Sequence, residues 1–365
     1  MRIGVPKETA VGETRVALTP DVAKRLIGKG FEVLLERSAG AAAHFPDEDY
    51  EASGAVLGDA AEALSADLVV KIRRPSGDEI EGMREGAVLI GFTELCEDDG
   101  TLAALHRRGV SMLAMERMPR ISRAQAMDAL SSQSNIGGYR AVIEAAAHYG
   151  RFFPVMMTPA GSAKPARVLV IGAGVAGLQA IATARRLGAE VWAYDVRPET
   201  AEQIRSLGAK PVELDLGESG AGEGGYAREL SEEARQRQQE LLSEELAKAH
   251  VIITTALIPC RPAPELISEE VVRRMREGSV IVDLAAANGG NCALTEKDEV
   301  VVRHGVTIIG HTNFPAMVPS DASTFYAGNI RNLLEIMVDA SGDAPALKDL
   351  DEDEITKAMR VRPES

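Results

Sequence analysis

The sequence has little of what secreted, membrane-spanning or nucleic-acid-binding proteins need. Among 365 residues there are three cysteines, Cys96, Cys260 and Cys292, with no Cys-x-x-Cys spacing, so we expect isolated reduced thiols rather than a disulfide framework or a zinc site. No apolar run approaches the roughly 18 residues of a membrane span, and the N-terminus lacks a signal-peptide pattern. A net charge of −15 argues against a nucleic-acid partner. The histidines are scattered, so we expect no metal site.

The most specific pattern in the chain ends at Asp195. An apolar run, Val168 to Ile171, leads into Gly172-Ala-Gly174-Val-Ala-Gly177, a helical segment follows, and a second apolar run ends on Asp195. A G-x-G-x-x-G turn between a strand and a helix, followed by an acidic residue about 20 positions later, is typical of a dinucleotide-binding unit. The alternative is a Rossmann-like fold whose crevice is vacant or has another use.

Each residue type in this pattern has a physical role. Gly172 permits the tight turn, Gly174 lets the backbone approach a pyrophosphate, and Gly177 lets helix and strand pack closely. The helix N-terminus adds free N–H groups for the anion. Asp195 is expected to accept hydrogen bonds from ribose hydroxyls, which favours NAD(H) over NADP(H), although Arg197 weakens this preference because an arginine can receive a 2′-phosphate.

Apolar runs and helical patterns alternate in two series, which predicts two Rossmann-like domains with parallel, doubly wound sheets. The expected strands of the first series are 3–6, 32–35, 68–72, 88–92 and 111–114, with a helix at 19–28. Those of the second are 168–171, 191–194, 211–214, 251–254, 280–283 and 307–310. Long helices at 124–149 and 322–338 are expected to join the domains around a cleft, where ligands commonly bind. The predicted domains are 1–126 with 320–365, and 127–319.

Two segments have an unusual composition. Residues 217–240 begin with five glycines in nine residues and continue into a charged, helix-prone stretch. Long loops of this kind are often lids, and Tyr226 is a large ring at the end of the glycines. A disordered surface insertion is an equal alternative. The acidic tail from Asp339 is expected to be a solvated or partly ordered end.

Six segments together resemble a known family. They are MRIGVPKE (1–8), RVALTP (15–20), MPRISRAQAMD (118–128), SSQSN (131–135), MTPAG (157–161) and GHTN (310–313). The family is that of alanine dehydrogenase and the NAD(H)-binding component, domain I, of proton-translocating transhydrogenase. The resemblance extends over about residues 1 to 338.

Two positions separate the branches of this family. Alanine dehydrogenases carry a catalytic His where this sequence has Cys96, in Phe92-Thr-Glu-Leu-Cys96, and a catalytic Asp where it has Ala287, shortly before Gly289-Gly290. An amino-acid dehydrogenase needs a general base, and these residues do not supply one. Arg15 and the basic cluster 71–74 resemble the carboxylate-binding part of that site, either as an inherited remnant or as structural ion pairs.

A third position favours the transhydrogenase branch. Arg120, Gln125 and Asp128 have the spacing of the loop that holds the nicotinamide and its ribose in domain I. The resemblance also places Ser131 beside the nicotinamide, although a capping role at the N-terminus of the joining helix is as plausible. Gly225 and Tyr226 resemble the mobile loop that closes over NAD(H).

The resemblance thus implies NAD(H) bound to this chain and direct hydride transfer to or from NADP(H) on a partner subunit, coupled to proton translocation by a membrane subunit. The implied pyrophosphate contacts are Gly172, Gly174, Val175 and Gly177, the adenosine contacts Asp195, Val196 and Arg197, and the ring-pocket residues Ala256 and Leu257. It further implies a homodimer, and a separate soluble subunit held at the cytoplasmic face of the membrane by its partners. An NAD-dependent alanine or amino-acid dehydrogenase and a plain NAD(H)-binding regulator remain the alternatives.

Overall fold

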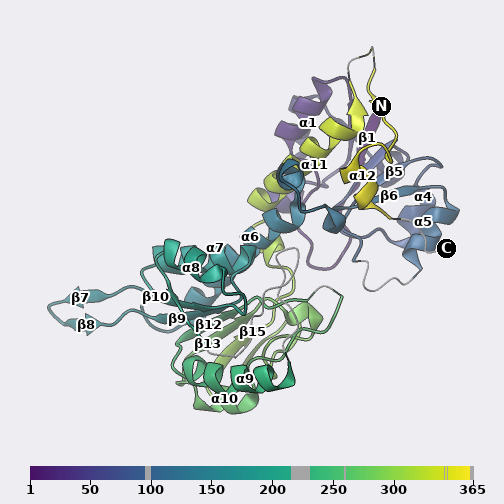
Figure 1. Ribbon diagram of the computed structural model, residues 1–365. Coiled ribbons are helices and arrows are strands. Elements are labelled where there is room, and N and C mark those ends of the chain that lie inside the picture. Colours follow the sequence, from purple (N-terminus) through teal and green to yellow (C-terminus); the bar gives the residue numbers. More distant parts are fainter. Residues whose placement is uncertain (95–99, 215–230, 259, 341, 343, 362–365) are drawn as a thin grey trace. The chain divides into compact units, whose positions relative to one another are not determined.

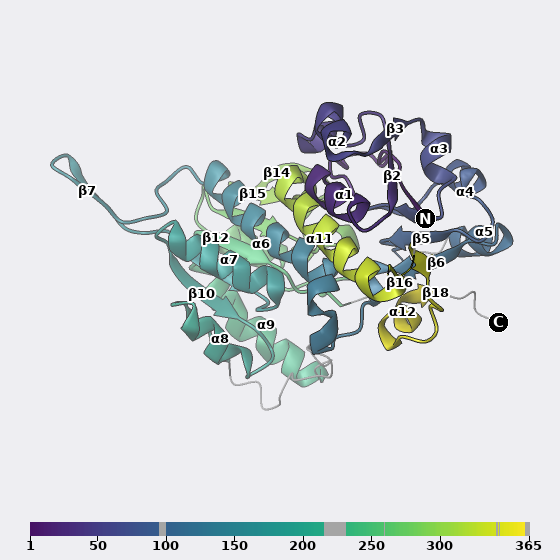
Figure 2. The same ribbon diagram turned by 90° about the horizontal axis from the view of Figure 1, so that it is seen from above.

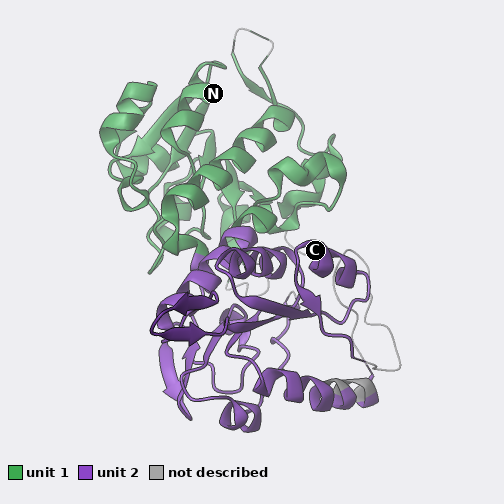
Figure 3. Ribbon diagram, turned by 90° about the vertical axis from the view of Figure 1, so that its left-hand side faces the viewer, with its two compact units in different colours: residues 1–133, 315–365 green, residues 134–314 purple. Residues whose placement is uncertain are grey.

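The computed structural model describes residues 1–94, 100–214, 231–258, 260–340, 342 and 344–361. The chain forms two compact units, residues 1–133 with 315–365 (unit 1) and residues 134–314 (unit 2), which Figure 3 distinguishes by colour. The chain passes from one unit to the other within helix α6 (Ala129–His148) and within the 3-10 turn Phe314–Met317. In the described part of the chain, no helix has the length and hydropathy to cross a membrane.

Unit 1 is built on a seven-stranded sheet with the order β18-β6-β5-β4-β1-β2-β3. Its strands are β1 (Arg2–Val5), β2 (Glu32–Glu36), β3 (Val56–Gly58), β4 (Leu68–Val70), β5 (Val88–Gly91), β6 (Ser111–Ala114) and β18 (Arg360–Val361). All neighbours are parallel except β18, which pairs antiparallel with β6. The helices are α1 (Pro20–Ile27), α2 (Asp47–Ser53), α3 (Ala60–Leu64), α4 (Gly77–Gly82), α5 (Thr101–Arg107), α11 (Pro319–Met337) and α12 (Glu354–Met359).

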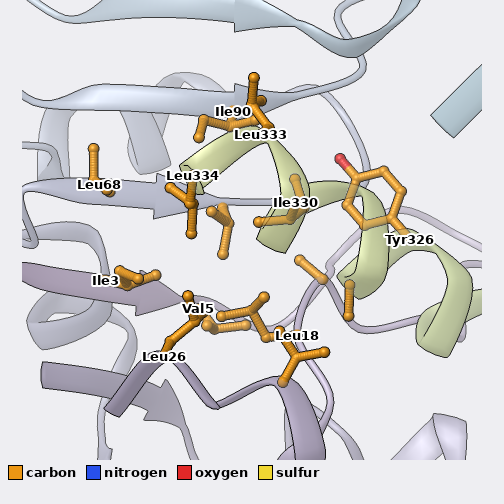
Figure 4. Packing of buried hydrophobic residues seen from close by; sticks show 14 of the residues in the cluster. Ile3, Val5, Leu18, Leu26, Leu68, Ile90, Tyr326, Ile330, Leu333 and Leu334 are labelled. Atoms are coloured by element: carbon orange, nitrogen blue, oxygen red, sulfur yellow. The ribbon is translucent and has the colours of Figure 1, made fainter. Parts of the chain in front are cut away.

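The core of unit 1 forms where α11 covers the sheet (Figure 4). Ile3, Leu68 and Ile90 come from adjacent strands and are fully or almost fully buried, and Ile330 and Leu333 of α11 lie against them. Strands covered on both faces have near-continuous apolar sequences. This explains why the short runs of β4 and β5, buried at every position, are recognisable in the sequence.

Unit 2 contains a second seven-stranded sheet with the order β11-β10-β9-β12-β13-β15-β14. Its strands are β9 (Arg167–Ile171), β10 (Glu190–Tyr194), β11 (Lys210–Pro211), β12 (Val251–Thr254), β13 (Val280–Asp283), β14 (Val300–Arg303) and β15 (Val306–Ile309). Only β14 is antiparallel to its neighbour. The helices after α6 are α7 (Val175–Arg186), α8 (Thr200–Ser206), α9 (Glu232–Ala247) and α10 (Glu269–Arg274). The expected fold class, two Rossmann-like α/β domains with mainly parallel sheets, is therefore confirmed.

Several elements differ from the expectation. The predicted helix 124–149 is a 3-10 turn, Ser122–Met127, followed by α6, since Asp128 interrupts it. The tail is not simply a solvated end, because β16 (Val338–Asp339), β17 (Ala346–Leu347), α12 and β18 form there, and Ile355 and Met359 are fully buried.

Unit 2 also contains a hairpin that sequence reasoning did not predict, β7 (Met156–Thr158) with β8 (Gly161–Ala163). Figures 1 and 2 show it extending away from the unit 2 sheet.

The expectation of three isolated thiols holds at Cys292, which is free and buried. It is wrong at Cys260, which is disulfide-bonded.

Candidate functional site

The glycine turn of unit 2 joins β9 to α7 and has the predicted strand–turn–helix form. Gly172 has a φ of +92°, which favours glycine, and a Cβ there would lie 2.4 Å from the Thr255 Oγ1. A Cβ on Gly177 would lie 1.8 Å from the Gly172 carbonyl oxygen. Gly174, in contrast, faces open space, with nothing within 4 Å of a Cβ. The turn is therefore closed on its protein side and open beside the first turn of α7.

That open space suits an anion such as a pyrophosphate. The first-turn N–H groups of a helix have no intrahelical carbonyl partner, and the helix dipole adds positive potential there. Gly174 is the residue immediately before α7, and Val175, the first helical residue, is 41% exposed. The absence of a side chain at Gly174 leaves the room that a phosphate group needs.

Asp195 follows β10 and is nearly buried by Arg197. Its Oδ1 accepts hydrogen bonds from the Arg197 backbone N–H and Nε, both at 2.9 Å. Its Oδ2 accepts from the Arg197 Nη2 at 2.8 Å and from the Ala173 N–H at 2.7 Å. The side-chain hydrogen bond to Asp195 also raises the pKa of the Arg197 guanidinium. Asp195 thus links the glycine turn to the end of β10.

A cavity of about 240 Å³ lies beside this pair in unit 2. Asp195, Val196 and Arg197 line one part of it, and Ile204 and Leu214 contribute apolar surface. Its mixture of a charged rim and apolar walls suits one end of a nucleotide, since ligand pockets combine apolar lining with a few polar groups.

Asp283, at the end of β13, is a structural centre that sequence reasoning missed. The side chain is fully buried and accepts five hydrogen bonds. The donors are the hydroxyls of Thr254 and Thr295 and the backbone N–H groups of Ala285, Asn291 and Cys292, at 2.7 to 3.1 Å. A buried carboxylate needs such donors, but the sequence spacing of these donors carries no recognisable signal.

Through Asn291, this centre fixes the segment after β12. The Asn291 amide accepts from the Ala256 N–H at 3.1 Å and donates to the Ala256 carbonyl at 2.9 Å and to the Pro264 carbonyl at 2.8 Å. Leu257 is 44% exposed beside this anchored residue. The two predicted ring-pocket residues therefore lie on a backbone held in place by Asn291.

The polar residues predicted to hold the nicotinamide lie on one segment of unit 1. Arg120 and Gln125 are exposed, and Asp128 and Ser131 are half-buried. Asp128 caps α6, because its Oδ1 accepts from the Ser131 N–H at 2.9 Å and its Oδ2 accepts from the Ser131 hydroxyl at 2.5 Å. The capping residue at this helix start is thus Asp128, with Ser131 as its hydrogen-bond donor.

The basic residues Arg15 and Lys71 form ion pairs inside unit 1. The Arg15 Nε and Nη2 donate to the Glu13 carboxylate at 2.7 Å each, and its Nη1 donates to Gln133 at 2.8 Å. The Lys71 Nζ lies 2.7 Å from Glu79 and 3.5 Å from Glu8. Desolvation raises the pKa of Glu8. Of the two interpretations of these cations, the structure shows the ion pairs.

Some predicted residues lie outside the described part of the chain. Gly225, Tyr226 and Cys96 are among them, as is most of the predicted lid, 217–240, of which only α9 and the residue before it are described. In the ranges that are described, no group of three or more His, Cys, Asp or Glu side chains is arranged to hold a metal ion.

Comparison with known proteins gives consistent matches. Residues 4–137 match the family model "Alanine dehydrogenase/PNT, N-terminal domain", and residues 141–362 match the corresponding C-terminal domain model. The first of the separate alpha-subunit chains of NAD(P) transhydrogenase from Rhodospirillum rubrum is 51% identical over 361 residues, which cover 96% of this chain and 94% of that protein. Alanine dehydrogenase of Bacillus subtilis is 29% identical over 371 residues, covering 96% of this chain and 88% of that one.

A solved structure supports the same relationship. The transhydrogenase from Sinorhizobium meliloti superposes with a TM-score of 0.84 at 44% sequence identity, covering 92% of this chain and 94% of that chain.

Proposed function

The chain belongs to the alanine dehydrogenase/PNT family, and we propose that it is the NAD(H)-binding component of a proton-translocating NAD(P) transhydrogenase. Hydride passes directly between the NAD(H) bound here and NADP(H) held on a partner subunit. A membrane subunit couples this transfer to proton translocation, and the chain is held at the cytoplasmic face of the membrane through its partners. The bound nicotinamide cofactors supply the hydride chemistry, and the protein supplies binding and orientation.

Unit 2 supplies the residues for the adenosine and pyrophosphate. Gly172, Gly174, Val175 and Gly177 form the pyrophosphate cradle, which the open space at Gly174 fits. Asp195, Val196 and Arg197 hold the adenosine end, beside the cavity that they line. Ala256 and Leu257 contact the nicotinamide side, and Gly225 and Tyr226 close over the cofactor.

Unit 1 supplies the residues that orient the nicotinamide. Arg120 and Gln125 are exposed and hold its carboxamide by hydrogen bonds. Asp128 and Ser131 fix the ribose side, using a carboxylate and a hydroxyl that already form one rigid cap. These groups place the ring without moving a proton, because the reaction transfers hydride alone.

The observation that carries the choice between the two family branches is the β13 loop. An amino-acid dehydrogenase needs a general base next to its substrate. Here Ala287 is exposed in a segment, Leu284 to Gly290, that contains no acidic residue. The nearest carboxylate, Asp283, is fully buried, and five donors occupy its oxygens.

The exposed hairpin of unit 2 is the surface we assign to a homodimer contact. Val155, Met156 and Met157 are 59%, 38% and 81% exposed, and no charged residue lies between Arg151 and Lys164. Such a large exposed apolar arm marks an interaction site. Shortening the hairpin to a two-residue turn would convert the dimer to a monomer in analytical ultracentrifugation, and an unchanged dimer would refute the assignment.

Hydride transfer from NADPH to an NAD⁺ analogue with shifted absorbance tests the function. We expect no transfer with this chain alone and transfer when a transhydrogenase NADP(H)-binding domain is added. Gln125→Asn should lower the transfer rate about tenfold or more while NADH affinity changes less than about threefold, since ring placement is lost and the adenosine contacts remain. Turnover of pyruvate, ammonia and NADH by this chain alone would favour the amino-acid dehydrogenase. Tight NADH binding without any transfer would favour a regulator.

A further inference from the structure

The C-terminal segment of the chain packs into unit 1 beside the segment that carries Gln125. β18 extends the sheet by pairing with β6, Arg360 opposite Leu113 and Val361 opposite Met112. α12 precedes it and buries Ile355 and Met359 completely. Figures 1 and 2 show α12 next to β6 at this edge of the sheet. An acidic tail with few apolar residues thus uses those few to dock onto the unit.

Asp353, the residue before α12, forms a two-pronged ion pair with Arg123. The Arg123 Nη1 donates to the Asp353 Oδ2 and its Nη2 donates to the Oδ1, both at 2.8 Å, and Glu354 Oε1 lies 3.4 Å from Nη2. Asp353 also caps α12 by accepting from the Ile355 N–H at 2.8 Å. Because α12 is anchored by buried side chains, the carboxylate is a fixed partner for Arg123. The hydrogen bond to Arg123 lowers the pKa of Asp353.

Helix α11 holds the same segment from its other side. The amide nitrogens of Asn329 and Asn332 both donate to the Ala126 carbonyl at 2.9 Å. Ala124 and Met127 are buried. Gln125 is therefore an exposed residue between two anchored ones, with Arg123 tied to α12 and Ala126 tied to α11.

We propose that Asp353 is a positioning residue for hydride transfer, which fixes Arg123 and through it the orientation of Gln125. This inference rests on the proposed function, in which Gln125 orients the nicotinamide. A misplacement of about 1 Å can cost about 100-fold in rate, so a contact that contributes little to folding can matter for transfer. The pair is partly exposed, with side-chain accessibilities of 49% for Arg123 and 25% for Asp353, and exposed pairs add little to stability.

The test is Asp353→Asn, measured with the full chain and the added NADP(H)-binding domain. Asparagine caps helices as well as aspartate does, so α12 remains capped while the charge is lost. We expect hydride transfer to fall about fivefold to twentyfold, with the NADH dissociation constant changing less than about twofold. Asp353→Glu should restore part of the rate. Arg123→Gln should give a similar loss, and the double variant should be no slower than either single one, because both remove one interaction.

Glu335→Gln is the matched control. Glu335 lies on α11 of the same unit and forms an exposed ion pair with Lys29 at 2.7 Å, away from the Gln125 segment. Its rate should equal that of the unsubstituted chain. If Asp353→Asn and Glu335→Gln behave alike while Gln125→Asn is slow, the positioning role is refuted and the proposed function stands. If the unsubstituted chain transfers no hydride with its partner, the proposed function fails and this inference fails with it.

Discussion

Replacement of Asp195 by alanine should change which nucleotide the chain prefers. In the structure this carboxylate accepts four hydrogen bonds, three from Arg197 and one from the Ala173 N–H. The variant removes the proposed ribose acceptor, and it releases the guanidinium of Arg197, whose side chain is 13% exposed. A group that disfavours a 2′-phosphate is thereby exchanged for one that can bind it.

The magnitude follows from the contacts. A hydrogen bond to a charged group contributes about 1.5–3 kcal/mol, so NADH should bind about 10- to 150-fold more weakly. NADPH gains from the loss of repulsion by the carboxylate and from the released Arg197. Losing the Ala173 contact loosens the glycine turn for both nucleotides equally. The ratio of their dissociation constants is therefore the informative quantity, and it should shift toward NADPH by at least about tenfold.

Isothermal titration of the isolated chain with each nucleotide measures this ratio. Glu190→Ala is the matched control, because Glu190 lies at the opposite end of the same strand and pairs with Lys210 at 2.7 Å. A ratio that stays within about threefold of the original in Asp195→Ala would show that Asp195 does not select the nucleotide. A similar shift in the control would show that the effect arises from general loss of charge.

Three further predictions concern single residues. Gly174→Ala should leave the free energy of unfolding within about 0.5 kcal/mol, since nothing lies within 4 Å of a Cβ there, yet it should weaken NADH binding at least about tenfold by filling the phosphate space; unchanged titration would contradict the cradle. Lys71→Met leaves the buried Glu8 without its cation and should cost about 3–5 kcal/mol in urea unfolding, whereas a loss below about 1 kcal/mol would contradict the ion pair. Burial, with nearby arginines, lowers the pKa of His250, and its Nδ1 accepts from the Arg167 N–H at 3.0 Å. Its contribution is therefore complete above about pH 6.5 and lost as the pH falls toward the lowered value, so His250→Gln should flatten the stability profile of unit 2 between about pH 6.5 and 5 by up to about 1.4 kcal/mol per pH unit.

The parallel strands and the fingerprint turn are predictable from the sequence because their signals are local. β12 and β13 are buried at every position, so each is a continuous apolar run. β3 and β14 were missed because they are edge strands with exposed residues, such as Val56 at 49% and Val302 at 61%. Their place depends on pairing with a neighbour that the sequence does not identify.

The candidate site divides in the same way. The glycine spacing is a local signal, and the structure shows why, since a side chain on Gly177 would meet the Gly172 carbonyl. The hydrogen bonds of Asp283 and the pairing of Asp353 with Arg123 join residues that are 2 to 29 and 230 positions apart. No periodicity marks such partners, so composition described the tail only as acidic.

Aspartates at the candidate site illustrate what a hydride-transfer site needs from its carboxylates. Asp195 holds the Ala173 N–H, Asp128 holds the Ser131 N–H, and Asp283 holds the Asn291 N–H. In each case the carboxylate oxygens are already committed to backbone donors, so their main effect is to fix the turn on which a proposed cofactor contact lies. A base that takes a proton from a substrate needs a free lone pair directed at that proton. Fixed carboxylates at the end of a strand or the start of a helix are therefore suited to holding a cofactor in one orientation, which is the requirement of a reaction in which only hydride moves.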